Sequence, residues 1–182
     1  MLAKRIMATT NAKRALVVGL GLSGLSSARW LAGRGYRVTV VDSRAQPPGL
    51  GALHAELPEV KAHTGGFDPA LFRDPGLLVV SPGVSLAESV IAEAVARGVE
   101  TVGDVELFAR HAQAPVLAVT GANGKSTVTS LVGAMCQEAG LDTAVGGNIG
   151  VPVLDLLRSP EPDVYVLELS SFQLETTTSL NA

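Results

Sequence analysis

Short apolar runs alternate with longer amphipathic stretches along most of this chain. Runs of Val, Leu and Ala predict buried strands, and stretches with apolar residues at helical spacing predict the helices between them. This alternation indicates an α/β protein built on parallel sheets. Strands are expected at 15–18, 38–41, 77–80, 99–102, 116–119, 143–145 and 163–169, and helices at 23–32, 86–97, 104–111, 126–139 and 151–157. Residues 47–66 show no regular period and begin with a Pro-Pro-Gly turn.

A glycine-rich loop, Gly19-Leu20-Gly21-Leu22-Ser23-Gly24, joins the first predicted strand to the first predicted helix. Its glycines let the backbone approach a phosphate, and the start of the helix adds a positive dipole end. Asp42 closes the next strand, about 20 residues after the loop, as in the dinucleotide fingerprint where a carboxylate accepts a ribose hydroxyl. The residues alone therefore predict an NAD-binding half, although the glycine loop indicates a nucleotide or phosphate ligand in general and says little about which one.

Ser81-Pro82-Gly83 follows the apolar strand expected at 77–80. Open α/β sheets bind ligands beyond the carboxyl ends of their strands, so Ser81 and Gly83 are candidates for ligand contact. The same tripeptide is also typical of an ordinary Pro-Gly turn. The pattern leaves both interpretations open.

A second glycine-rich loop, Thr120-Gly121-Ala122-Asn123-Gly124-Lys125-Ser126-Thr127, connects a predicted strand to a predicted helix. This order is typical of a P-loop, in which backbone amides cradle phosphates, a lysine contacts the outer phosphates and a hydroxyl binds Mg²⁺. The loop is a short variant, because Val119 stands where a glycine is usual. A lysine beside a helix N-terminus is disfavoured by up to about 1 kcal/mol unless an anion binds there, so Lys125 favours a phosphate site. The alternative is a turn capped by Ser126 or Thr127, with Lys125 in solvent.

Three further residues stand out on the predicted elements. Glu168 lies in the apolar strand at 163–169, where a carboxylate is costly unless a cation meets it, so it is a candidate to bind Mg²⁺ together with Ser126. The alternative is an exposed glutamate at the end of a strand. Asp104 is expected to cap the helix at 104–111. Cys136 is expected to be a buried apolar thiol rather than a nucleophile.

Composition excludes several classes of protein. The chain has 182 residues, 47% hydrophobic and 17% charged, which fits a well-buried α/β protein. A net charge of −3 gives no broad basic surface for nucleic acid. The three histidines are scattered, and the single cysteine permits no intrachain disulfide. The basic start, followed by an apolar stretch, superficially resembles a signal peptide, but glycines and Arg29 interrupt that stretch. We therefore expect a cytoplasmic protein with no membrane partner.

The pattern predicts two domains. Residues 1–13 are expected to be a flexible tail, 14–103 a Rossmann-like domain, 104–114 a linker helix, and 115–182 the beginning of a P-loop ATPase-type central domain. A domain with only two or three strands cannot close its core. We therefore expect the chain to be part of a longer protein, with its last strand exposed or mobile unless the rest of that protein is present.

Together these motifs resemble the Mur ligase family. The first domain of that family is matched by the glycine loop at 19–24, Asp42-Ser43-Arg44, Ser81-Pro82-Gly83 and Gly103-Asp104-Val105-Glu106-Leu107-Phe108. The start of its central domain is matched by the loop at 120–127, Gly146-Gly147-Asn148-Ile149-Gly150 and the segment at 167–175. The resemblance covers nearly all of the chain after Lys13, and the order of the motifs is more specific than any one of them.

The resemblance implies a role for each matching residue. In this family the first domain binds the UDP end of a substrate, and not NAD. The implied contacts to that substrate are Gly21, Leu22, Ser23, Ser81, Pro82 and Gly83 near the pyrophosphate and sugar, Asp42, Ser43 and Arg44 near the uridine, and Asn148 and Gln173 near the muramoyl-alanine portion. The implied ATP site is Gly121, Ala122, Asn123, Gly124, Lys125, Ser126 and Thr127. The implied Mg²⁺ ligands are Ser126 and Glu168, and the implied catalytic residues are Lys125, Asn148 and Glu168.

The activity that the resemblance implies is ATP-dependent amide-bond formation in cytoplasmic peptidoglycan precursor synthesis. The motifs are most similar to the branch that adds D-glutamate to UDP-N-acetylmuramoyl-L-alanine through an acyl phosphate. The resemblance also implies that a second metal site, the rest of the ATP pocket and the D-glutamate site lie beyond Ala182. We expect a monomer.

Two other classes stay open. A sister ligase, or a folate polyglutamate ligase, would share the short phosphate loop, although the folate enzymes lack a preceding Rossmann-like domain. An NAD-binding regulatory module joined to an NTPase would explain the glycine loop and Asp42. It would leave the Ser81-Pro82-Gly83 motif and the 167–175 segment unexplained.

Overall fold

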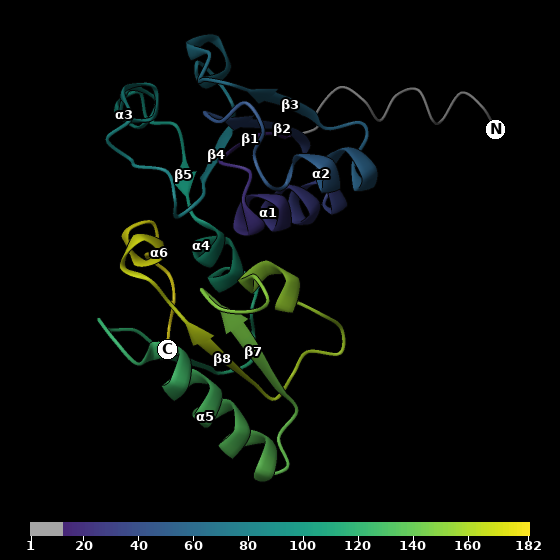
Figure 1. Cartoon of the computed structure of the whole chain (residues 1–182), viewed down its shortest axis with the longest axis vertical. Coiled ribbons are helices and arrows are strands. Elements are labelled where there is room, and N and C mark those ends of the chain that lie inside the picture. The colour runs from purple at the N-terminus through teal and green to yellow at the C-terminus, as the bar shows by residue number, and fades with distance from the viewer. Residues whose placement is uncertain (1–12) are drawn as a thin grey trace, which may run out of the picture.

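The computed structural model describes residues 13–182, which form two parallel β-sheets with packed helices (Figure 1). The five-stranded sheet has the order β3-β2-β1-β4-β5 and the three-stranded sheet the order β6-β8-β7. We call each sheet with its helices the first unit and the second unit; α4 and α6 lie between them (Figure 1). The tail expected at 1–13 lies, up to residue 12, outside the described residues. The α/β class with parallel sheets is confirmed.

The elements of the first unit are β1 (Arg14–Val18), α1 (Leu22–Gly33), β2 (Arg37–Asp42), α2 (Leu50–Glu56), β3 (Lys61–Thr64), the 3₁₀ helix η1 (Pro69–Phe72), β4 (Leu77–Val80), α3 (Ser89–Ala96) and β5 (Thr101–Val102). Those that follow are α4 (Asp104–Ala109), β6 (Val116–Val119), α5 (Lys125–Glu138), β7 (Thr143–Gly147), the 3₁₀ helix η2 (Val153–Leu156), β8 (Val164–Glu168) and α6 (Ser171–Glu175).

The strand order of the first unit creates a ligand position between β1 and β4. Both strands are continuous apolar runs and are almost entirely buried, as expected for central strands covered on both faces. After edge strand β3 the chain crosses to β4 on the other side of β1. The loops after β1 and β4 therefore leave the sheet in opposite directions, and open α/β sheets bind ligands at such a point.

The last strand of the second unit, β8, lies in the middle of its sheet. It pairs with β6 on one side and β7 on the other, and all of its residues from Val164 to Glu168 are buried. The expectation that this strand is exposed is wrong. The order of strands in a sheet need not follow the order in the chain, and a central position pairs the backbone of β8 on both sides.

The segment without a regular pattern, 47–66, contains α2 and β3. Only Leu53 of α2 is fully buried, and β3 is a largely exposed edge strand. With so few buried positions, neither element shows the apolar periodicity by which it would be recognised.

Other local predictions are wrong in detail. The helix expected at 151–157 is the 3₁₀ helix η2. Gly103, and not Asp104, is the N-cap of α4, which ends at Ala109, two residues before the end expected at 111. Cys136 is partly exposed rather than buried.

An apolar core runs through the junction of the two units. One cluster of buried side chains includes Val17 of β1, Phe108 of α4 and Tyr165 of β8. The rings of Phe108 and Tyr165 pack edge to face, with centroids 4.9 Å apart. A polar contact adds to this, because Ser26 Oγ donates a hydrogen bond to Asp155 Oδ1 at 2.7 Å. The junction therefore fixes how the two sheets face one another.

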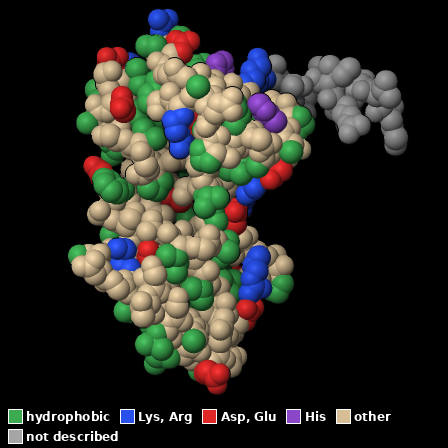
Figure 2. All heavy atoms as spheres, viewed as in Figure 1, with side chains coloured by type: hydrophobic (Ala, Val, Ile, Leu, Met, Phe, Trp, Pro, Cys, Tyr) green, Lys and Arg blue, Asp and Glu red, His purple; other side chains and the backbone are tan. Residues whose placement is uncertain are grey.

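The second unit leaves apolar side chains in contact with solvent. Figure 2 shows hydrophobic side chains on its surface, where α5 contributes exposed Val128, Leu131 and Met135. These side chains are exposed because the sheet covers only one face of α5. Among residues 13–182, no helix combines the length and hydrophobicity that crossing a membrane requires.

Candidate functional site

The glycine loop after β1 is held by close packing against the start of α1. A Cβ atom added to Gly24 would lie 1.9 Å from the carbonyl oxygen of Gly19, so only glycine fits there. Gly19 is in turn fixed to the neighbouring strands, because its N–H donates to Val41 O and its carbonyl oxygen accepts from Ser81 Oγ. The loops after β1 and β4 therefore form one rigid wall.

Asp42, at the end of β2, is a buried carboxylate that holds this loop wall in place by hydrogen bonds. Its Oδ2 accepts the Leu20 N–H at 2.7 Å, and its two oxygens accept the Arg44 guanidinium at 2.9 and 2.6 Å. Oδ1 also accepts the Arg44 N–H at 2.8 Å. The hydrogen bond from Arg44, with those from the two N–H groups, lowers the pKa of Asp42 to about 2 although burial opposes this. The Asp42 carboxylate thus already accepts four hydrogen bonds from the protein.

A cavity of about 510 Å³ opens above these loops and reaches the second unit. Ten of the eleven residues predicted to contact the UDP-linked substrate line it, and only Gln173 does not. The ten are Gly21, Leu22, Ser23, Asp42, Ser43, Arg44, Ser81, Pro82, Gly83 and Asn148. The structure therefore brings together residues from four separate loops.

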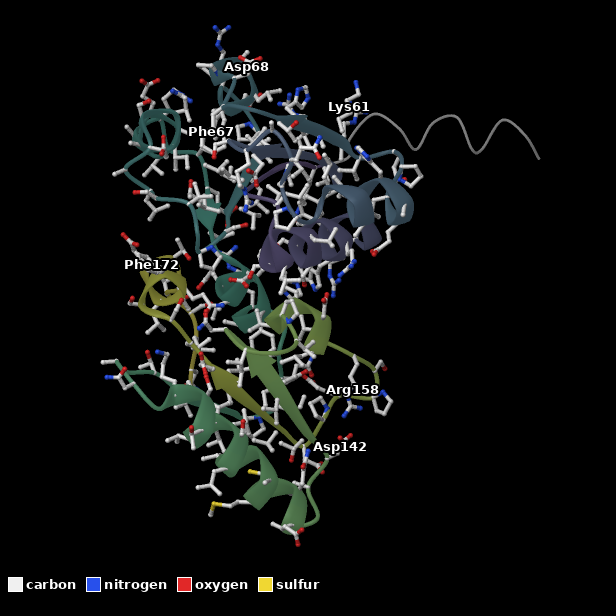
Figure 3. All side chains as sticks on the ribbon, viewed as in Figure 1. Lys61, Phe67, Asp68, Asp142, Arg158 and Phe172 are labelled. Carbon is white, nitrogen blue, oxygen red and sulfur yellow. The ribbon has the colours of Figure 1, made fainter. Side chains whose placement is uncertain are left out.

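Gln173 is instead buried in α6. It closes a capping box with Ser170, whose N–H it accepts at 3.0 Å, and only 1% of it is exposed. Its neighbour Phe172 is largely exposed and points away from α6 (Figure 3). Phe172 lines a smaller pocket together with Ser81 and Gly83, so α6 lies beside the cavity wall.

The loop from Thr120 to Thr127 leads from β6 into α5, which begins at Lys125. Gly121 to Gly124 are exposed, so their backbone amides are open to a ligand. Lys125 Nζ donates to the carbonyl oxygen of Gly121 at 2.9 Å and lies across its own loop. The positive charge is therefore held at the position where a phosphate would bind.

Glu168, at the end of β8, joins this loop to the cavity. Its Oε2 accepts Ser126 Oγ at 2.6 Å, and its Oε1 accepts Asn148 Nδ2 at 2.8 Å. Burial alone would raise its pKa, but these two hydrogen bonds and the charge of Lys125 outweigh it and lower the pKa. The carboxylate is therefore ionised at neutral pH, and the alternative of an exposed strand-end glutamate is wrong.

Glycine is required where Asn148 meets Glu168. A Cβ atom on the preceding Gly147 would lie 2.3 Å from the carbonyl oxygen of Glu168. The close approach lets the Asn148 N–H donate to that same carbonyl oxygen at 2.8 Å. The ends of β7 and β8 are thus joined through both backbone and side chains.

The oxygen atoms of Ser126 and Glu168 fit a magnesium ion. Mg²⁺ prefers oxygen ligands and is usually held by one or two protein groups together with phosphates and water. Within residues 13–182 no group of three His, Cys, Asp or Glu side chains could hold a metal alone. A hydroxyl and an ionised carboxylate 2.6 Å apart match the pattern of a nucleotide-bound ion.

Sequence reasoning did not predict that two acidic side chains of the junction are buried. Asp104 and Glu106 of α4 are each only 2% exposed. Glu106 accepts the Thr178 N–H at 2.7 Å and the Ser179 N–H at 2.9 Å. The two acids stand in the first turn of a helix, where acidic residues are common, so no local pattern signals their burial.

The fold and the site define a two-unit α/β protein in which a cavity lies between loops of both units, and the loop at 120–127 is joined to that cavity through Glu168 and Asn148. A family model described as the Mur ligase MurD-like N-terminal domain matches residues 13–103, and one described as the Mur ligase middle domain matches residues 119–182. The chain belongs to the Mur ligase family.

Curated relatives are similar over nearly the whole chain. A UDP-N-acetylmuramoylalanine–D-glutamate ligase of Nitrosococcus oceani is 56% identical over 171 residues, which are 94% of this chain and 38% of that protein. The ligase of the same name from Methylobacillus flagellatus is 59% identical over 172 residues, covering 93% and 38%. The chain thus spans about 38% of the length of these relatives.

Solved structures share the fold at lower identity. The UDP-N-acetylmuramate:L-alanyl-γ-D-glutamyl-meso-diaminopimelate ligase of Neisseria meningitides matches with a TM-score of 0.56 and 20% identity, over 87% of this chain and 52% of that one. UDP-N-acetylmuramate-alanine ligase from Thermotoga maritima matches with a TM-score of 0.52 and 20% identity, over 86% and 37%.

Proposed function

We propose that this chain supplies the UDP-substrate site and part of the ATP site of a ligase that joins D-glutamate to UDP-N-acetylmuramoyl-L-alanine. One observation carries the proposal. Asn148 lines the cavity and donates to Glu168, which in turn accepts Ser126 of the phosphate loop. A substrate end in the cavity would therefore lie beside a bound nucleotide. The names of the relatives support the choice of substrates.

Each part of the chain would have its own function. Residues 14–103 are the Rossmann-like domain for the UDP-linked substrate, 104–114 connect the domains, and 115–182 begin the ATP-binding domain. The activity belongs to cytoplasmic peptidoglycan precursor synthesis.

The UDP end would occupy the cavity above β1 and β4. Loop amides and the hydroxyl groups of Ser23 and Ser81 are donors for a pyrophosphate. The side chain of Arg44 is 54% exposed above Asp42, which leaves one face of the guanidinium for the uridine. Because Asp42 already accepts four protein donors, it is poorly suited to accept the ribose hydroxyls of NAD.

ATP would bind along the loop from Gly121 to Thr127. The Lys125 ammonium group would give up its hydrogen bond to the carbonyl oxygen of Gly121 and contact the outer phosphates instead. Ser126 and Glu168 would hold Mg²⁺. Magnesium, when bound, neutralises charge on those phosphates. Lys125 and the loop amides would stabilise charge on the γ-phosphoryl group of ATP as its bond to ADP breaks and a bond to an oxygen of the alanyl carboxylate forms, which gives ADP and an acyl phosphate.

The reaction needs that transfer because a carboxylate is a poor acyl donor. The acyl phosphate is then attacked by the amine of D-glutamate; a C–N bond forms and phosphate leaves. Asn148, fixed by Glu168, would position the muramoyl-alanine end of the substrate close to the phosphate loop.

Isothermal titration calorimetry of this chain tests the proposal. We expect UDP-N-acetylmuramoyl-L-alanine to bind most tightly, UDP more weakly, and NAD not measurably. Tighter binding of NAD than of UDP would indicate the regulatory alternative. Tighter binding of UDP-N-acetylmuramate than of its alanyl form would indicate a sister ligase.

A further inference from the structure

Asp155 of η2 joins the second unit to the first helix of the chain. Its Oδ1 accepts a hydrogen bond from Ser26 Oγ at 2.7 Å, and its Oδ2 accepts one from Arg29 Nη1 at 3.5 Å. Both donors lie on α1, and η2 is in contact with that helix (Figure 1). The three side chains form one polar link across the junction, which we call the Asp155 tie.

Ser26 is the stronger partner in this tie. It is fully buried, at 0% exposed. A serine inside a helix commonly donates to the carbonyl oxygen one turn before it, whereas Ser26 donates to the other unit. A hydrogen bond to a carboxylate is roughly twice as strong as one between neutral groups. The contact of Arg29 is longer and partly exposed, so it contributes less.

A second acid orients Arg29. Its Nε and Nη2 donate to the two carboxylate oxygens of Glu56, at the end of α2. This bidentate pair fixes the plane of the guanidinium group, and Nη1 is left to donate to Asp155.

The position of η2 determines one wall of the cavity. The loop before it, residues 147–152, supplies all the lining residues of the second unit. At its start the Gly147 N–H donates to the carbonyl oxygen of Val151 at 2.8 Å, and at its end the Asp155 N–H donates to that of Pro152 at 3.0 Å. A loop that is closed on itself and bonded to η2 moves together with η2.

The opposite wall begins one turn before Ser26 on the same helix. Leu22 and Ser23, in the first turn of α1, line the cavity. Residues three and four apart on a helix lie on one face, so the place of Ser26 fixes the place of both. Asp155 does not line the cavity and links the two walls from outside it.

We propose that Asp155 is a positioning residue that sets the spacing between the two walls of the cavity. The inference rests on the proposed function, in which the UDP end contacts the first unit and the muramoyl-alanine end reaches Asn148 in the second. A ligand that contacts both walls binds only those molecules in which the spacing fits, so its affinity falls with their fraction. UDP alone contacts one wall, and its affinity does not depend on the spacing.

Calorimetry of this chain with two ligands tests the inference. We expect Asp155→Ala to weaken binding of UDP-N-acetylmuramoyl-L-alanine about tenfold, as for a lost hydrogen bond to a charged group, and to leave UDP within about twofold. Asp155→Asn keeps an oxygen acceptor for Ser26 and should lose at most about threefold. Glu138→Ala removes an exposed carboxylate from the end of α5 in the same unit, and this control should bind both ligands normally.

A double-mutant cycle separates the tie from general damage. Ser26→Ala alone should weaken binding of the alanyl ligand about fivefold, and adding it to Asp155→Ala should cost almost nothing more. Circular dichroism checks that each variant is folded. If Asp155→Ala is not, Ser26→Ala decides the question with the same two ligands.

Four results would overturn the inference. They are fully additive losses in the cycle, an equal loss of UDP affinity in a folded variant, unchanged affinity of Asp155→Ala for the alanyl ligand, and an Asp155→Asn variant as weak as Asp155→Ala. Failure of the unmodified chain to bind UDP-N-acetylmuramoyl-L-alanine would contradict the proposed function instead.

Discussion

Asn148 and Glu168 are joined twice, side chain to side chain and backbone to backbone, each at 2.8 Å. The pair connects the end of β7 to the end of β8. Asn148 lines the cavity between the two units, while the other oxygen of Glu168 accepts a hydrogen bond from Ser126 Oγ. A change at Asn148 therefore acts on two sites at once.

We expect Asn148→Ala to weaken binding of UDP-N-acetylmuramoyl-L-alanine and of Mg²⁺–ATP, each about tenfold, because one oxygen of a buried carboxylate loses its donor. Calorimetry with each ligand measures this. Asn181→Ala, an exposed asparagine, is the matched control. Loss of only one of the two affinities would show that the two sites are independent.

Lys125→Ala should abolish measurable binding of Mg²⁺–ATP and leave the affinity for UDP-N-acetylmuramoyl-L-alanine within about twofold, because the lysine lies across its own loop and that loop does not line the cavity. Titration with a fluorescent ATP analogue gives the first value and calorimetry the second. Lys61→Ala removes the same charge from edge strand β3, where Lys61 is exposed (Figure 3). Equal loss of both affinities would instead indicate a structural role for Lys125.

Asp42 should make stability depend on pH. Its pKa is about 2 instead of the usual 3.8, so its ionised form stabilises the folded chain above about pH 4, and this is lost as pH falls toward 2. The shift corresponds to about 2 kcal/mol at neutral pH. Urea unfolding should show Asp42→Asn less stable by roughly that amount at pH 7 and closer to the unmodified chain at pH 3. A difference that does not change with pH would refute this origin.

Glu106→Gln should loosen the segment after α6. Burial would raise the pKa of Glu106, but the hydrogen bonds from Thr178, Ser179 and Arg110 lower it to about 2, so a full charge is lost at neutral pH. Hydrogen exchange at Thr178 and Ser179 should accelerate at least about tenfold. Glu100→Gln, which removes an exposed partner of Arg110, should leave both amides protected.

Local sequence was sufficient for the strands at the centre of the first unit and for both glycine loops. β1, β2 and β4 form within one residue of their predicted positions, because a continuous apolar run specifies a buried parallel strand wherever it stands. The ten cavity-lining residues were named from the resemblance to the Mur ligase family, and each lies in a loop after a strand or at the first turn of a helix.

Tertiary structure alone decided the strand order of the second unit and the surroundings of the site side chains. The sequence could not show that β8 would pair between β6 and β7, because strand order depends on contacts between distant segments. It could not show that Asp42 is satisfied by Leu20 and Arg44, or that Gln173 is buried and does not line the cavity. Residue type and spacing define which chemistry a side chain can perform. Burial and hydrogen-bond partners come from residues far apart in the chain. They decide which part of that chemistry the side chain can still perform in the folded protein.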